Sequence, residues 1–202
     1  MSVTGDCRHM ERLDQYLAEA EQAHGHLCAG QVLGVRMAML GLKQLGIEDP
    51  RVKDRKRLVT FVEIDRCATD AVGVVTGCRL GKRALKFRDW GKMAATFVDV
   101  NTGRALRIAA KESAKALARQ MHPEIASKNQ QQMLAYREMT DAELFVQEWV
   151  KVELSPEELP GYQGERIVCA ACGEGISFHR EVVRDNQTIC LGCAGERYYE
   201  PV

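Results

Sequence analysis

Two histidines and a cysteine stand close together early in the chain, in the segment His24-Gly25-His26-Leu27-Cys28. Imidazole and thiolate groups bind metal ions or act as bases and nucleophiles. The segment separates two stretches with a helical pattern, and a thiol at the start of the second helix is favoured as a thiolate. Cys28 is therefore a candidate ligand or nucleophile, with His24 as a candidate base. The alternative is that Cys28 is a small buried apolar residue and the histidines merely end a helix.

A second group of polar and thiol side chains follows residues 58–64, which have the β-branched and aromatic content of a strand. Asp65, Cys67 and Asp70 come directly after it, and a rigid strand end is a common place for a functional site. Mixed imidazole and thiolate ligands suit zinc, nickel or iron. The carboxylates are candidate additional ligands or partners that orient the ligands. The candidate ligands of such a metal site are His24, His26, Cys28, Cys67 and Cys78.

The last part of the chain contains two CxxC pairs, Cys169/Cys172 and Cys190/Cys193, with 17 residues between them. This spacing is typical of structural zinc sites with four thiolates, because each pair points two sulfurs at one ion. A disulfide pair or an iron–sulfur cluster is the alternative. The residues between the pairs predict a hairpin of 176–184 with 188–189, in a treble-clef or zinc-ribbon-like module. So small a unit needs the metal to fold, and a closed four-thiolate site is structural, not catalytic.

Composition narrows the function classes. Of the 202 residues, 46% are hydrophobic, which is enough for a core, and the 28 basic and 28 acidic residues cancel. A general electrostatic attraction to nucleic acid or to an anionic membrane is therefore not encoded. We find neither a signal peptide nor a membrane-length apolar run, and expect a cytoplasmic protein. In that reducing compartment the eight cysteines are expected to be metal ligands or reactive thiols.

The chain divides by its pattern into a core domain, residues 1–154, a Pro- and Gly-containing linker, 155–165, and a zinc finger, 166–202. We expect an α+β core. Small residues at Gly30, Gly34 and Ala38 lie along one face of a helix and predict close packing of a neighbour there. Helices are predicted over residues 11–23, 32–45, 68–76, 109–121 and 124–137, and a short one begins at a Thr140–Glu143 capping box. Strands are predicted over residues 58–64, 85–87, 93–100, 105–108 and 145–154, with 85–87 and 93–100 as an antiparallel pair around Asp89-Trp90-Gly91.

Four motifs, in this order, resemble the E-subunit family of molybdenum/tungsten formylmethanofuran dehydrogenase. They are residues 24–30, 63–71, 76–82 and 89–94, and a two-CxxC tail follows them. The resemblance implies helices packed on an antiparallel or mixed sheet, a C-terminal zinc finger and a homodimer. It also implies a polar pocket with further lining or bracing residues at Lys82, Asp89 and Lys92. Ala29 and Arg79 depart from the family pattern, which has proline and threonine there.

The resemblance also orders the functional hypotheses. In that enzyme the catalytic work is attributed to other subunits, so we expect a metal-binding accessory protein of a molybdenum or tungsten oxidoreductase, with a finger that docks to the complex. One alternative is an enzyme in its own right, which uses Cys28 with a histidine or an open metal site. Another is a regulator whose finger meets nucleic acid or polymerase. The acidic residues of the finger disfavour that last hypothesis.

Overall fold

The computed structural model describes residues 3–200, and their side chains from residue 9 onward. The chain divides into two compact units, Met1–Glu153 and Leu154–Val202. Within the described residues, no helix combines the length and the apolar character that crossing a membrane requires.

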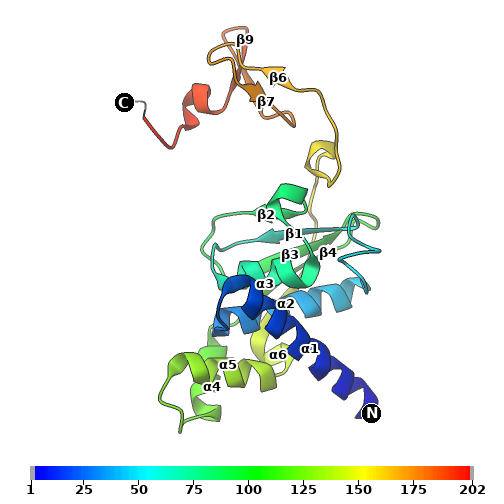
Figure 1. Cartoon of the computed structure of the whole chain (residues 1–202), viewed down its shortest axis with the longest axis vertical. Coiled ribbons are helices and arrows are strands. Elements are labelled where there is room, and N and C mark those ends of the chain that lie inside the picture. Colours follow the sequence, from blue (N-terminus) through cyan, green and yellow to red (C-terminus); the bar gives the residue numbers. More distant parts are fainter. Residues whose placement is uncertain (1–2, 201–202) are drawn as a thin grey trace. The chain divides into compact units, whose positions relative to one another are not determined.

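The first unit is an α+β fold built on one mixed sheet, as predicted (Figure 1). The strands lie in the order β2-β1-β3-β4-β5, and only the β1–β2 pair is parallel. The strands are β1 (Leu58–Val62), β2 (Leu85–Phe87), β3 (Ala94–Asp99), β4 (Ala105–Ala110) and β5 (Phe145–Val150). The helices are α1 (Val3–His24), α2 (Ala29–Leu45), α3 (Cys67–Thr76), α4 (Ser113–Met121), α5 (Lys128–Glu138) and α6 (Asp141–Leu144), with a single 3-10 turn, η1 (Leu80–Lys82).

Helix α2 lies at the centre of this unit, and most of its residues are buried. It packs against the sheet at Gly41, where an added Cβ would lie 2.4 Å from the Phe97 ring. It packs against α3 at Gly34, where a Cβ would lie 2.5 Å from the carbonyl oxygen of Ala68. The predicted close packing along the small-residue face is thus confirmed, and α3 is its partner. Glycine is needed at both positions because a side chain would push the elements apart.

The predicted hairpin of residues 85–87 with 93–100 is wrong. β2 pairs with β1 in parallel, β3 pairs with the other edge of β1, and β1 therefore separates them. The segment between β2 and β3 wraps around the end of β1, since the backbone N–H groups of Trp90 and Lys92 both donate to the carbonyl of Glu63. A buried central strand needs hydrogen-bond partners on both edges, and this need overrides the local turn pattern of Asp89-Trp90-Gly91.

Other predicted elements are present with shifted ends. Residues 109–110 belong to β4, and the following helix α4 begins only at Ser113. α5 begins at Lys128, capped by the Ser127 side chain, which accepts a hydrogen bond from the Gln130 N–H. The Thr140–Glu143 capping box is confirmed at the start of α6. Ala109 and Ala110 join β4 because they pair with Val146 and Phe145 of β5, and this tertiary pairing overrides the helix propensity of alanine.

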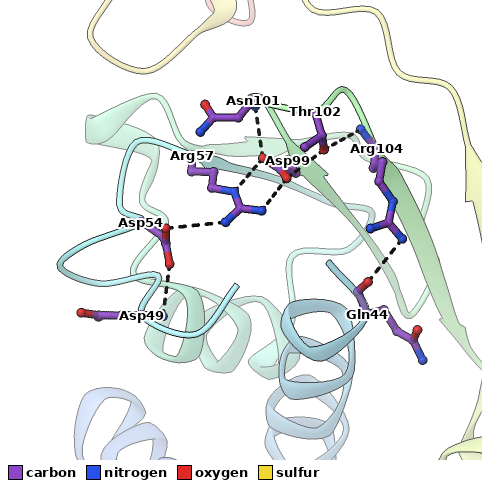
Figure 2. A network of polar contacts seen from close by, with 8 residues as sticks. All are labelled: Gln44, Asp49, Asp54, Arg57, Asp99, Asn101, Thr102 and Arg104. Carbon is purple, nitrogen blue, oxygen red and sulfur yellow. Dashed lines mark hydrogen bonds and ion pairs between the residues drawn. The ribbon is translucent and has the colours of Figure 1, made fainter. Parts of the chain in front are cut away.

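A polar network around Asp99 ties the connection that precedes β1 to the β3–β4 turn (Figure 2). The Asp99 carboxylate is buried and accepts hydrogen bonds from Arg57 Nε at 2.9 Å, Arg57 Nη2 at 2.8 Å and the Thr102 hydroxyl at 2.8 Å. The Arg57 guanidinium, above all, holds the pKa of Asp99 below its ordinary value. This network fixes the start of the strand that leads into the candidate core site.

The second unit is small and has little apolar core. Its elements are η2 (Pro156–Glu158), β6 (Ile167–Val168), β7 (Gly175–Ile176), β8 (Glu181–Arg184), β9 (Gln187–Cys190) and a helical turn, η3 (Gly192–Glu196). β8 and β9 form the predicted hairpin, and Asp185 and Asn186 at its turn have φ angles of 50° and 60°. Gly175–Ile176 pairs with β6 instead of extending this hairpin. Among the described residues of this unit, the buried apolar cluster comprises Cys169, Ile176 and Ile189.

Candidate metal centre and thiol site

The four finger cysteines come together as their spacing predicts. The sulfurs of Cys169, Cys172, Cys190 and Cys193 all lie within 4.8 Å of one another. Cys169 follows β6, and Cys190 ends β9, so two short β-hairpins bring the two CxxC pairs face to face. Among the described residues, this is the only set of three or more His, Cys, Asp or Glu side chains whose ligand atoms are so close.

Backbone N–H groups point at these sulfurs. The Cys190 N–H donates to Cys169 Sγ at 3.3 Å, and the Cys193 N–H donates to Cys190 Sγ at 3.3 Å. Hydrogen bonds from the backbone, first that of Cys172 and then that of Cys190, lower the pKa of Cys169 to about 6. The Glu174 N–H lowers the pKa of Cys172, but hydrogen bonds with the other thiols, first Cys169, and burial outweigh it and raise that pKa to about 12.

This pattern fits a zinc ion. Four thiols in contact cannot all ionise without a cation, because each thiolate disfavours the next. A divalent ion with a preference for sulfur and tetrahedral geometry removes that repulsion. Arg197 adds a positive charge at the edge of the site, since its Nη2 donates to Cys193 Sγ at 3.5 Å. The four cysteines therefore suit a closed structural zinc site.

The core site begins with His24, the last residue of α1. Its Nδ1 lies 2.8 Å from Asp70 Oδ2 on α3, and its side chain is 20% exposed. Gly25 ends the helix with a φ of 96°, in the left-handed region that favours glycine. The bond to Asp70 fixes the imidazole ring and leaves Nε2 available. His26 is exposed, and its ring centroid lies 4.8 Å from that of His24.

Cys28 and Cys67 meet beside this histidine. Cys28 is the N-cap residue of α2, and Cys67 is the first residue of α3. Burial first, and then the neighbouring Cys28 thiol, raise the pKa of Cys67. Gln31 fixes the start of α2, where Cys28 lies, against α1. Its amide oxygen accepts from the Cys28 N–H at 3.3 Å, and its amide nitrogen donates to the Ala20 carbonyl on α1 at 3.0 Å.

A shallow cavity of about 370 Å³ opens next to these groups. Predicted residues on its wall are His24, Asp65, Cys67 and Asp70. The sequence interpretation did not include Arg66 and Thr69, which also line it, nor the buried Gln31. Arg66 and Thr69 lie inside the 63–71 motif, so that motif was a usable signal. For Gln31 the signal was its place three residues after Cys28, the N3 position of a capping box.

The structure does not bring the remaining predicted residues to this cavity. Cys78 lies at the other end of α3, only 2% exposed, where its thiol contacts the Thr60 hydroxyl at 3.6 Å and the Leu58 carbonyl at 3.7 Å. Cys78 is there because the chain after α3 leads into β2, which pairs with β1, so the length of the helix separates it from Cys67. Lys82, Asp89 and Lys92 are exposed and do not line the cavity. Lys92 instead lies over the Trp90 ring, 5.7 Å from its centroid.

Comparisons with known proteins agree with this division of the chain. Residues 23–146 match the family described as FmdE, molybdenum formylmethanofuran dehydrogenase operon. Residues 162–199 match the prokaryotic dksA/traR C4-type zinc finger. The solved structure of a tungsten formylmethanofuran dehydrogenase FmdE-like protein from Syntrophus aciditrophicus has the same fold, with a TM-score of 0.61 and 21% identity over 93% of this chain and 95% of that chain.

A curated relative from Archaeoglobus fulgidus, named "Probable S-adenosyl-L-methionine-binding protein", is 31% identical over 93% of this chain. The chain spans about half of that protein, 54% of its length. The FmdE match covers more than half of the present chain and contains every residue of the core site described above. The chain therefore belongs to the FmdE family, and it carries a C4-type zinc finger after the family domain.

Proposed function

We propose that this protein is an accessory metal-binding protein with two sites of different character. The finger holds a structural zinc ion through its four cysteines. The core holds a second, exchangeable ion through His24, Cys28 and Cys67, at a site that keeps a position open to solvent or a small ligand. The observation that carries the core site is the 2.8 Å contact between His24 Nδ1 and Asp70. A carboxylate that orients a histidine in this way is typical of histidines that bind metals through the other ring nitrogen.

The donor set indicates which ions the core site would take. One imidazole and two thiolates are borderline to soft ligands, which suit zinc, nickel or iron and disfavour magnesium or calcium. Unlike the finger sulfurs, the three ligand atoms are not already gathered at bonding distance. Binding of the ion would therefore require rotation of these side chains. This supports an exchangeable ion, and not a structural ion that the domain needs in order to fold.

The finger is proposed to dock the protein to a molybdenum or tungsten oxidoreductase, which the family description supports. Residues 154–202 carry four basic and eight acidic side chains, which gives them a net charge of −4. Because the whole chain has a net charge of zero, residues 1–153 carry +4. A zinc ion bound by four thiolates would add two further negative charges. Such a surface disfavours nucleic acid and favours a basic protein partner. We further propose a homodimer, as the family resemblance implies.

The experiment that tests the core site is metal analysis of the full-length protein. After anaerobic purification and incubation with zinc, nickel or ferrous iron, we expect about two ions per chain. His24→Ala and Cys28→Ala are expected to lose the second ion and to keep the finger zinc. His9→Ala removes an exposed histidine elsewhere and serves as the matched control. One ion per chain in the wild-type protein under all three conditions would refute the core site.

Docking is tested separately, by size-exclusion chromatography with a purified molybdenum or tungsten formylmethanofuran dehydrogenase. The full-length wild-type chain is expected to co-elute with the enzyme. Cys190→Ser, which removes one zinc ligand, is expected not to co-elute, while His24→Ala still does. Equal co-elution of all three would show that the finger is not the docking element. The chain alone, measured by light scattering, reports the proposed homodimer.

A further inference from the structure

The two half-buried thiols of the core lie together where the amino-terminal ends of two helices meet. At Gly30 of α2, an added Cβ would lie 3.5 Å from Cys67 Cβ and 3.7 Å from Cys28 Sγ. Gly30 is therefore flanked by both cysteines. The two cysteines therefore lie on the same side of this glycine. No disulfide joins them.

Their surroundings differ from those of the other core thiol. Cys28 and Cys67 are partly exposed, and Cys67 lies on the wall of the 370 Å³ cavity, so a small reagent has access to it. Cys78 is buried among apolar residues and has no such access. Cys28 is the N-cap residue of α2 and Cys67 the first residue of α3, so both thiols lie at helix starts near the surface.

We propose that Cys28 and Cys67 form a reversible dithiol–disulfide pair, which controls whether the core can hold its ion. The oxidant is a low-molecular-weight disulfide. The Cys28 thiolate attacks one of its sulfurs, forms a mixed disulfide and releases one small thiol. Cys67 loses its proton, attacks Cys28 Sγ and releases the second small thiol. Two protein thiols and one small disulfide thus become one protein disulfide and two small thiols, and a small dithiol reverses the reaction.

Sulfurs that have formed a disulfide no longer act as anionic ligands, so the disulfide would prevent the core from binding its ion. This part of the proposal rests on the proposed function. The formation of the disulfide does not depend on the proposed metal site. Oxidation and metal binding are mutually exclusive in this scheme, so a bound ion protects the pair and an oxidised pair excludes the ion.

The test uses the full-length protein with zinc in the finger, treated with oxidised glutathione. Remaining thiols are alkylated, and the digested peptides are assigned by fragmentation in a mass spectrometer. We expect a Cys28–Cys67 link that dithiothreitol removes. Cys28→Ser and Cys67→Ser should abolish it, and Cys78→Ser should not. A stable glutathione adduct on Cys28 without transfer, a link from either cysteine to a different partner, or full alkylation of both would overturn the proposal.

Metal analysis of the same samples separates this proposal from the proposed function. A second ion in the reduced protein that is lost in the oxidised protein supports both. A disulfide in a protein that never binds a second ion supports the thiol pair and refutes the core metal site. A second ion that survives oxidation, with no disulfide formed, refutes the switch and leaves the metal site standing.

Discussion

Asp70 contacts Nδ1 of His24 at 2.8 Å, across 46 residues of sequence, and so joins the end of α1 to the first turn of α3. The carboxylate fixes the ring orientation, and removal of such a partner typically weakens metal binding by about 10- to 100-fold. We therefore expect Asp70→Asn to weaken the binding of the second ion by that factor and to leave the affinity of the finger for zinc unchanged. Competition with a chromogenic chelator measures both affinities.

Asp65→Asn is the matched control for Asp70→Asn. Asp65 lines the same cavity, and its substitution removes the same charge. An equal loss of affinity in both variants would mean that the net charge of the cavity, not the orientation of His24, determines binding.

Gly34→Ala is expected to destabilise the core, because the new Cβ would lie 2.5 Å from the Ala68 carbonyl oxygen and 2.8 Å from Ala68 Cα. Overpacking against backbone costs about 3 kcal/mol at the upper end of its range, whereas alanine gains about 1 kcal/mol in helix propensity. The expected net loss is about 2 kcal/mol. Urea unfolding measures it, and both tryptophans, Trp90 and Trp149, belong to the first unit and report on it alone.

Gly81→Ala is the control for this substitution. An added Cβ there meets no atom within 4 Å, so the free energy of unfolding should change by less than about 0.5 kcal/mol. If Gly34→Ala proved equally neutral, α3 would be free to move away from α2, and the meeting of Cys28 with Cys67 would lose its support.

Sequence reasoning found the four ligands of the finger and its main hairpin because that information is local, although it assigned Ile176 to the hairpin and missed the β6–β7 pair. The spacing of Cys169/Cys172 and Cys190/Cys193 determines the site, and the turn residues Asp185 and Asn186 determine the hairpin. Most core helices and strands were found for the same reason, since the hydrophobic period is a local property. The small-residue face of α2 even indicated a close neighbour.

Strand order and the membership of the core site depend on tertiary contacts, which the local pattern does not contain. The turn-like Asp89-Trp90-Gly91 suggested a hairpin, but hydrogen bonds to the Glu63 carbonyl carry the chain around β1 instead. Cys67 and Cys78 are eleven positions apart, yet α3 places one beside Cys28 and the other under β1. The positions of the cysteines in the sequence do not show which of them lie at the same end of a helix.

Asp99→Asn is expected to cost about 2 kcal/mol, because it removes the buried charge to which the partly exposed Arg57 guanidinium donates two hydrogen bonds. Asp54→Asn, which faces the same guanidinium at 3.7 Å, should cost less than about 1 kcal/mol. The pKa of Asp99 is lowered in the folded protein, so its contribution is complete above the ordinary pKa of about 4 and disappears as the pH falls below it. The stability difference between wild type and Asp99→Asn should shrink over that range. A constant difference down to pH 2 would contradict the ion-pair account.

Removal of zinc is expected to unfold the finger and leave the core folded. Among the described residues, the buried apolar cluster of the finger consists of Cys169, Ile176 and Ile189, with a few partly buried side chains packed against it. So small a core does not offset the backbone entropy lost on folding, and the metal must therefore supply much of the folding free energy. A strong chelator should therefore collapse the NMR dispersion of residues 166–200 and leave tryptophan fluorescence unchanged. If the NMR signals of the finger stayed dispersed without metal, the contacts between its residues would be enough to keep it folded.

Arg197→Ala is expected to speed zinc release from the finger several-fold. The Arg197 guanidinium donates to Cys193 Sγ at 3.5 Å, and this hydrogen bond is the first cause of the raised pKa of Arg197. A four-thiolate zinc site carries two net negative charges, and a neighbouring cation that donates to one sulfur reduces the attraction of that sulfur for protons and electrophiles. Arg184→Ala, an exposed arginine on β8, is the control for loss of charge alone. Zinc transfer to a chromogenic chelator, followed at several salt concentrations, distinguishes the two. Because a direct hydrogen bond is screened less than a distant charge, only the effect of Arg197→Ala should persist at high salt.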